Sequence, residues 1–137
     1  CRKLCPKHRK GEPRLLKNST RALRGAITVD DNQPEQILEA TKTLLEKMVS
    51  INDIGTEDII SVIFSMTRDL NAAFPAASAR EMGWRQVPLL CCSELEVPGS
   101  LPRCIRVLLF FNSSKRQQDL QPVYLRDAAS LREDLWQ

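Results

Sequence analysis

The sequence has 137 residues but only one histidine, His8, which lies among basic residues near the start of the chain. Histidine is the usual general base of enzymes that use a serine or cysteine nucleophile. Glycine-rich phosphate loops, HExxH, GxSxG and CxxC motifs are also absent. The sequence therefore argues against histidine-based nucleophilic catalysis and against nucleotide-dependent chemistry, and it predicts no cofactor.

No apolar run approaches membrane-spanning length, and none near the start resembles a signal-peptide core. We expect a soluble protein without a membrane partner. The five cysteines are odd in number, and Cys91 and Cys92 are adjacent, so a disulfide framework is not indicated. Cys1, Cys5 and His8 are spaced loosely like metal ligands, but no second ligand pair matches them, and we predict no metal site.

Charge divides the chain into two parts. Residues 1–20 hold seven Lys or Arg and one Glu, whereas residues 21–137 hold thirteen Lys or Arg and sixteen Asp or Glu. We expect a disordered basic arm at 1–20 and one folded domain at 21–137. The acidic body and an arm without aromatic residues disfavour a nucleic-acid partner, although an RNA-contacting tail remains an alternative. We expect a cytoplasmic location, or an organellar stroma if the arm is a transit-peptide remnant.

Hydrophobic periodicity predicts a single α/β (α+β) domain, in which a mixed sheet packs on one long and one short helix. The segment at 58–66 is almost continuously apolar, which is typical of a strand covered on both faces. Residues 30–33 (DDNQ) offer caps for the long helix, with Asn32 three residues before Glu35 and Pro34 in the first turn. The predicted strands are 21–29, 58–66, 84–92, 104–111 and 123–125, and the predicted helices are 34–49 and 75–80.

Arg106 stands in the otherwise apolar strand 104–111, where neither face has the polar pattern of a solvent face. A guanidinium group does not deprotonate. Burying it in an apolar layer without a partner costs roughly several kcal/mol, because its charge is then uncompensated. We therefore expect Arg106 to contact an anion. That anion is either a carboxylate of the protein or part of a ligand.

Several short segments resemble, in order and spacing, the monofunctional AroH-class chorismate mutases. They are residues 24–28 (RGAIT), 74–76 (FPA), 79–81 (ARE), 84–88 (WRQVP), 91–94 (CCSE), 99–107 (GSLPRCIRV), 123–125 (VYL) and 131–132 (LR). The resemblance covers residues 21–135 and implies a homotrimer like a pseudo-α/β barrel, with active sites between subunits. It implies conversion of chorismate to prephenate in aromatic amino-acid biosynthesis, by a non-covalent [3,3] rearrangement that needs no histidine.

The resemblance also implies roles for individual residues. Arg106 would donate to the ether oxygen of chorismate and to a carboxylate, Arg24 and Tyr124 would hold carboxylate, and Glu94 with Cys91 would contact the ring hydroxyl. The residues expected to line or close the pocket are Phe74, Arg80, Leu131 and Arg132.

The sequence departs from the family pattern at a few positions. Many members have a lysine at the position of Ala77 and a small polar residue at that of Leu90, and the C-terminal pattern LRPD reads Leu131-Arg-Glu-Asp134 here. Loss of the lysine removes a positive charge from the pocket mouth, which bears on substrate affinity more than on chemistry. The alternative to the enzyme is a non-catalytic trimeric small-molecule-binding protein of similar fold.

Overall fold

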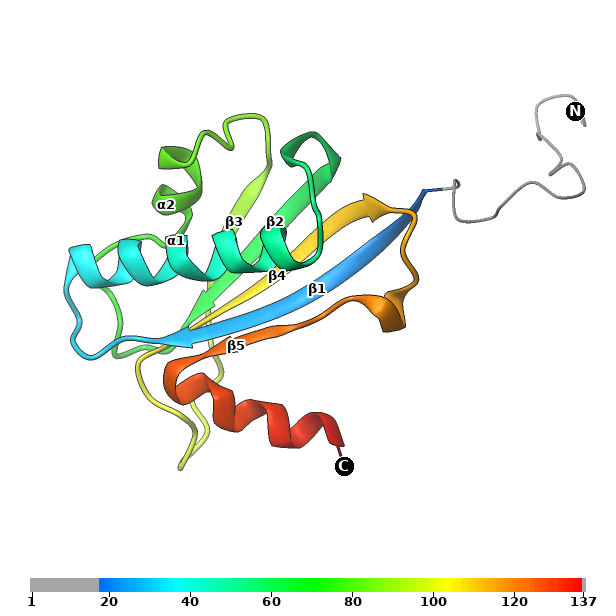
Figure 1. Ribbon diagram of the computed structural model, residues 1–137. Coiled ribbons are helices and arrows are strands. Elements are labelled where there is room, and N and C mark those ends of the chain that lie inside the picture. The colour runs from blue at the N-terminus through cyan, green and yellow to red at the C-terminus, as the bar shows by residue number, and fades with distance from the viewer. Residues whose placement is uncertain (1–17, 137) are drawn as a thin grey trace, which may run out of the picture.

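The computed structural model describes residues 18–136, which form a five-stranded mixed sheet with two α-helices on one face (Figure 1). The strand order is β3-β2-β4-β1-β5, with β4 antiparallel to β1 and β2, and with the pairs β1–β5 and β2–β3 parallel. The elements are β1 (Ser19–Thr28), α1 (Pro34–Ile51), β2 (Ile59–Met66), α2 (Ala76–Glu81), β3 (Leu89–Ser93), β4 (Cys104–Ser113) and β5 (Val123–Leu125), with 3₁₀ helices η3 (Thr56–Asp58), η4 (Gln117–Asp119) and η5 (Arg126–Trp136).

The predicted fold class and the order of strands and helices are confirmed, while some boundaries are wrong. β1 begins at Ser19, and the rest of the predicted basic arm, residues 1–17, lies outside the described residues. The third strand begins at Leu89 instead of residue 84, because the chain turns after α2 and buries the Trp84 side chain in the core. The 3₁₀ helices were not predicted.

Helix α1 buries one apolar face against the sheet and begins at Pro34, whose missing N–H costs nothing in the first turn. The N-cap residue is Gln33, the last of the four offered residues, and it makes no side-chain capping bond. The Asn32 side chain accepts instead from the backbone N–H groups of Asn71 and Ala72, each at 3.0 Å. Asn32 therefore ties the start of α1 to the loop before α2. The buried residues of α1 are Ile37, Ala40, Thr41, Leu44, Leu45 and Met48.

Gly25 allows α1 to lie close to β1. A Cβ atom at this position would lie 2.5 Å from the Met48 sulfur and 3.2 Å from Cδ1 of Leu44. Both side chains are fully buried in the main core, so neither has free space to move into. The distance between helix and strand thus depends on the absence of a side chain at residue 25.

Gly25→Ala is expected to lower the free energy of unfolding by about 1–3 kcal/mol, since the added methyl group overpacks the interface between β1 and α1. The measurement is urea unfolding. Gly55→Ala is the matched control, because there the new Cβ would meet the flexible, solvent-exposed Glu57 side chain. Equal midpoints for the two variants would contradict the tight contact.

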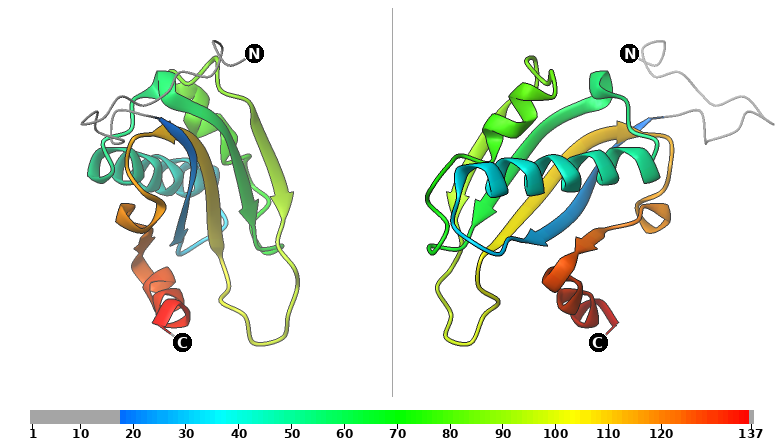
Figure 2. Two further views of the ribbon diagram at one scale, coloured as in Figure 1. Left: turned by 90° about the vertical axis from the view of Figure 1, so that its right-hand side faces the viewer. Right: turned by 60° about the vertical axis from the view of Figure 1, so that its left-hand side comes forward.

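Within the part of the chain that the structure describes, the face of the sheet opposite α1 is covered only at one end. There η5 packs Ala128 and Leu131 with Ala26, Cys104 and neighbouring apolar residues in a small second core. Elsewhere no described helix lies on this face, which we call the open face (Figure 2, left). The expectation that β2 is covered on both faces is therefore wrong for a single chain, in which Ile60 is 40% exposed.

The outer edge of β1 is occupied partly by a side chain. β5 pairs with β1 only at residues 25–27. Beyond β5, the Gln117 side-chain amide accepts from the Ala22 N–H at 3.1 Å and donates to the Ala22 carbonyl at 2.5 Å. Arg21 also donates through Nε to the Lys115 carbonyl at 2.7 Å. The segment after β4 thus extends the bonding of this edge beyond the short β5 strand.

Within residues 18–136, no helix is both long enough and apolar enough to cross a membrane.

Candidate active site

One row of side chains crosses all five strands on the open face of the sheet. The strand registers place Cys92 opposite Ser65, Ser65 opposite Arg106, Arg106 opposite Ala26, and Ala26 opposite Tyr124. Neighbours in such a row are separated by about 4.5–5.5 Å across each strand pair. Arg106 is therefore at the centre of the sheet, within reach of groups on β1, β2 and β5.

Arg106 contacts an anion, as its sequence environment predicts. Its Nε lies 2.6 Å from a carboxylate oxygen of Glu94, and the two side chains are 47% and 23% exposed. Glu94 is placed there by the end of β3, where its backbone N–H donates to the Met66 carbonyl at 3.0 Å. Arg106 is half-exposed because no described element covers the open face at this point. Its guanidinium is paired on one side and accessible to a ligand on the other.

A cavity of about 180 Å³ lies beside Arg106 on this face. Arg24 and Tyr124 line it from β1 and β5, so the structure brings together three of the residues predicted to hold chorismate. The two arginines and the phenol hydroxyl can donate hydrogen bonds to carboxylate or ether oxygens. We call Arg24, Glu94, Arg106 and Tyr124 the open-face half-site. The remaining lining residues are Gly25, Ala26, Ile63, Ser65, Val107 and Leu108.

Cys104 and residues of η5 pack beside this half-site, in the small second core that includes Tyr124. Cys104 is fully buried two residues before Arg106 on β4, in the small core with Tyr124 and Leu131. Burial raises the pKa of the Cys104 thiol, although the nearby Arg106 guanidinium opposes the shift. The thiol therefore stays neutral near pH 7 and adds no negative charge beneath Arg106. Leu131 packs in the cluster with Tyr124 but is not among the residues that line the cavity, and the side chain of Arg132 lies outside the described residues.

The other predicted residues gather at a different place, the outer edge formed by α2 and β3. Phe74, Arg80 and Cys91 line a cavity of about 310 Å³ together with Leu90, one of the positions that departs from the family pattern. Phe74 is 71% exposed and Leu90 is 58% exposed. We call Phe74, Arg80, Leu90 and Cys91 the edge half-site. Its arginine can hold an anion, and its apolar members can pack on a ring.

The two half-sites do not face each other within one chain. Their cavities share no lining residue, and β2 separates β3 from β4 in the sheet. Cys91 is opposite Phe64, whose side chain lies in the core under α1, while Cys92 belongs to the row with Arg106. The predicted joint contact of Cys91 and Glu94 with one hydroxyl group is therefore not assembled in a single chain.

Sequence reasoning missed several lining residues. Ser65 and Leu108 line the open-face cavity, and the register of β4 places them beside Arg106 and Arg24. Ser61 and Ser65 share one face of β2 with Ile63 between them, so β2 carried a weak alternating signal, whereas residues 104–111 of β4 are apolar on both faces apart from Arg106. The prediction of a fully covered strand passed over this pair of serines.

Among the residues that the structure describes, no group of three or more His, Cys, Asp or Glu side chains could hold a metal ion. The loosely spaced Cys1, Cys5 and His8 lie outside those residues.

Comparison with known proteins identifies relatives of the whole folded part. The family model described as chorismate mutase type I matches residues 20–135. The chain is 51% identical over 116 residues to chorismate mutase AroH of Thermus thermophilus, covering 84% of this chain and 95% of that protein. It is 42% identical over 116 residues to chorismate mutase AroH of Bacillus subtilis, covering 84% and 91%. A solved chorismate mutase from Clostridium thermocellum superposes with a TM-score of 0.79 and 48% identity, covering 80% of this chain and 97% of that one.

Proposed function

Because the chain belongs to the type I chorismate mutase family and is a chorismate mutase, we propose that its half-sites bind chorismate between neighbouring subunits of a homotrimer. The enzyme converts chorismate to prephenate in aromatic amino-acid biosynthesis. The observation that carries the proposal is the separation of the two half-sites within one chain. The open-face half-site offers arginines and a phenol for carboxylate groups, and the edge half-site offers an arginine and apolar side chains for a ring. Neither half-site alone is a complete pocket for chorismate.

Exposed apolar residues support assembly through the open face and the edge. Phe74 and Leu90 of the edge half-site, and Leu95 and Val97 after β3, are each more than half exposed. Large apolar side chains gathered around a charged site are typical of an interface between proteins. When the edge half-site of one subunit meets the open face of the next, these side chains leave water and the site becomes enclosed.

We assign the charge-stabilising role to the open-face half-site. Arg106 donates to the ether oxygen, where negative charge grows as the C–O bond breaks, and Glu94 holds the guanidinium in place at 2.6 Å. Arg24 and Tyr124 bind carboxylate across the same cavity. The substrate rearranges within itself, so holding its compact conformer removes much of the entropic barrier. No side chain has to accept or donate a proton.

The edge half-site supplies the remaining contacts in this proposal. Arg80 pairs with a carboxylate, and Phe74 and Leu90 pack on the ring. Cys91 and Glu94 would approach the same ring hydroxyl only across the interface, where one comes from each subunit. Leu131 and Arg132 of η5 close the pocket.

A cytoplasmic location is also proposed, since three described cysteines, Cys91, Cys92 and Cys104, are free thiols and suit a reducing compartment.

The kcat for chorismate is expected to vary less than about twofold from pH 6 to 9, because the rearrangement transfers no proton and the arginines stay charged. Ionisation of Cys104 should not alter kcat over this pH range, since burial raises the pKa of its thiol and keeps it neutral. The measurement is the loss of chorismate absorbance at saturating substrate. A bell-shaped kcat profile centred near neutrality would contradict the mechanism, and absence of turnover would contradict the function.

A further inference from the structure

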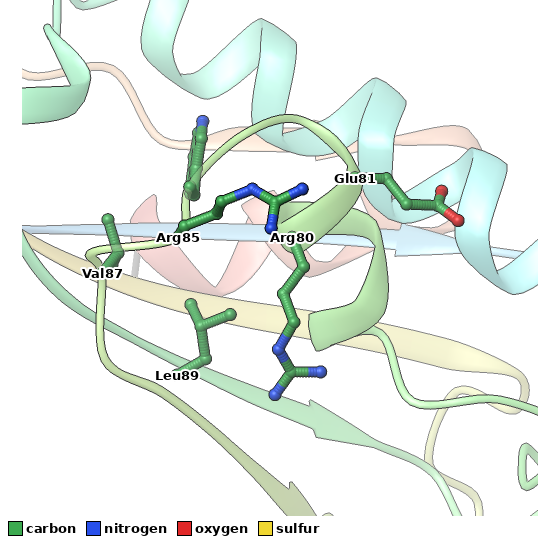
Figure 3. A pocket seen from close by; sticks show the side chains of 6 residues that line it. Arg80, Glu81, Arg85, Val87 and Leu89 are labelled. Atoms are coloured by element: carbon green, nitrogen blue, oxygen red, sulfur yellow. The ribbon is translucent and has the colours of Figure 1, made fainter.

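A third cavity, of about 460 Å³, lies between α2 and the start of β3 (Figure 3). This volume is in the range of sites that hold small organic ligands. Its lining combines two arginines with apolar side chains, and none of the roles assigned above uses it as a whole. The lining residues are Arg80, Glu81, Trp84, Arg85, Val87 and Leu89.

The charges around this cavity favour an anion. Among the side chains that the structure describes, those of residues 18–131, neither Arg80 nor Arg85 has a carboxylate oxygen within 4.0 Å. Glu81 is the only acidic residue of the lining, and Figure 3 shows its carboxylate turned away from both guanidinium groups. Two uncompensated positive charges at one hollow attract and concentrate anions.

The apolar part of the lining favours a ring. Val87 and Trp84 are buried at 8% and 4% exposure, and with half-buried Leu89 they give the cavity a firm wall. Such a wall can pack on the carbon skeleton of a ligand while the arginines bind its charged groups. The chemistry fits a small cyclic carboxylate better than inorganic phosphate, which has no apolar part to bury.

This cavity adjoins the edge half-site. Arg80 and Leu89 line both hollows, so the Arg80 guanidinium serves both. A carboxylate bound between Arg85 and Arg80 is therefore beside the place where we propose that chorismate binds.

We propose that this cavity is a capture site, where the cyclic dicarboxylate substrate first binds, and that Arg85 is its binding residue. This inference rests on the proposed binding of chorismate at the edge half-site. Arg85 attracts one carboxylate beside the edge half-site, away from the bond that breaks. An interaction of this kind acts equally on bound substrate and on the transition state, so it lowers KM and leaves kcat unchanged.

Arg85→Gln is expected to lower kcat/KM by about 5- to 10-fold at low ionic strength, through KM, while kcat stays within about twofold. The loss should shrink when salt is added, because ions screen exposed charges. Arg85→Lys keeps the charge and should recover most of the kcat/KM. Lys47→Gln, which removes the same charge from the exposed side of α1, is the control and should match the unaltered enzyme.

Binding of prephenate, followed by titration calorimetry on the same variants, tests the capture site without turnover. Arg85→Gln should weaken prephenate binding by a similar factor. An Arg85→Gln enzyme with the kcat/KM and prephenate affinity of Lys47→Gln would overturn the proposal. So would a fall in kcat accompanied by dissociation of subunits in light scattering, which would make Arg85 an interface residue. An unaltered protein that binds prephenate but does not turn over chorismate would overturn the proposed function alone.

Discussion

Arg106→Ala is expected to reduce kcat by at least about 10²–10³-fold, the cost of removing a preorganised donor to an oxygen that gains negative charge. Arg106 is at the centre of the row across the sheet, with one side of its guanidinium bound to Glu94 and the other accessible. Its interaction strengthens as the C–O bond breaks, so the loss in kcat should exceed the loss in substrate binding. Single-turnover rates and thermal unfolding measured on the same preparations separate these effects.

Arg106→Lys keeps the charge but loses the planar fork that reaches both Glu94 and a ligand, so it should recover only part of the rate. Neither variant should unfold the protein, because the Arg106–Glu94 pair is partly exposed and such pairs contribute about 1 kcal/mol or less. A folded Arg106→Ala protein with an unchanged single-turnover rate would remove Arg106 from the mechanism.

Mixing a variant damaged in the open-face half-site with one damaged in the edge half-site is expected to restore activity. In Arg106→Ala every open-face half-site is damaged, and in Arg80→Ala every edge half-site is damaged. If each site takes one half from each of two subunits, random trimers of the two chains contain about one intact site in four. Joint unfolding and refolding of an equal mixture should therefore give about a quarter of the normal kcat per chain. Light scattering should report about three chains of 15.6 kDa in the particles.

The matched control for this experiment mixes Arg106→Ala with Arg24→Ala. Both substitutions lie in the open-face half-site, so every chain in the mixture carries a damaged one and no site can be restored. Equal recovery in the two mixtures, or full activity from a monomer of the unaltered chain, would contradict the interfacial site.

Most of the fold was predictable because α1 and the strands carry strong patterns. The face of α1 from Ile37 to Met48 repeats with helical period, and β5 was placed at Val123–Leu125 without error. The start of β3 was missed because Trp84 and Val87 look like strand residues, although their burial comes from a turn that packs under α2. Local β propensity does not distinguish these two ways of burying a large side chain.

The site was predictable in composition but not in arrangement. The cost of an arginine in an apolar strand pointed to an anion beside Arg106, and Glu94 is that anion in the single chain. The assignment of Arg24, Tyr124 and the edge residues came from the resemblance to a family. Which of them face the same cavity depends on strand register, and register is a long-range property that the alternation of these apolar strands does not reveal.

The bonding of Gln117 to Ala22 bears on the solubility of the chain before it meets its partners. An exposed strand edge presents unsatisfied N–H and C=O groups that pair readily with strands of other molecules. β5 is only three residues long, and the Gln117 amide occupies both backbone groups of Ala22 just beyond it. The Gln117 side chain thus makes the hydrogen bonds that one more strand residue would make. It protects newly made subunits from edge-to-edge aggregation and leaves the apolar surfaces free for assembly.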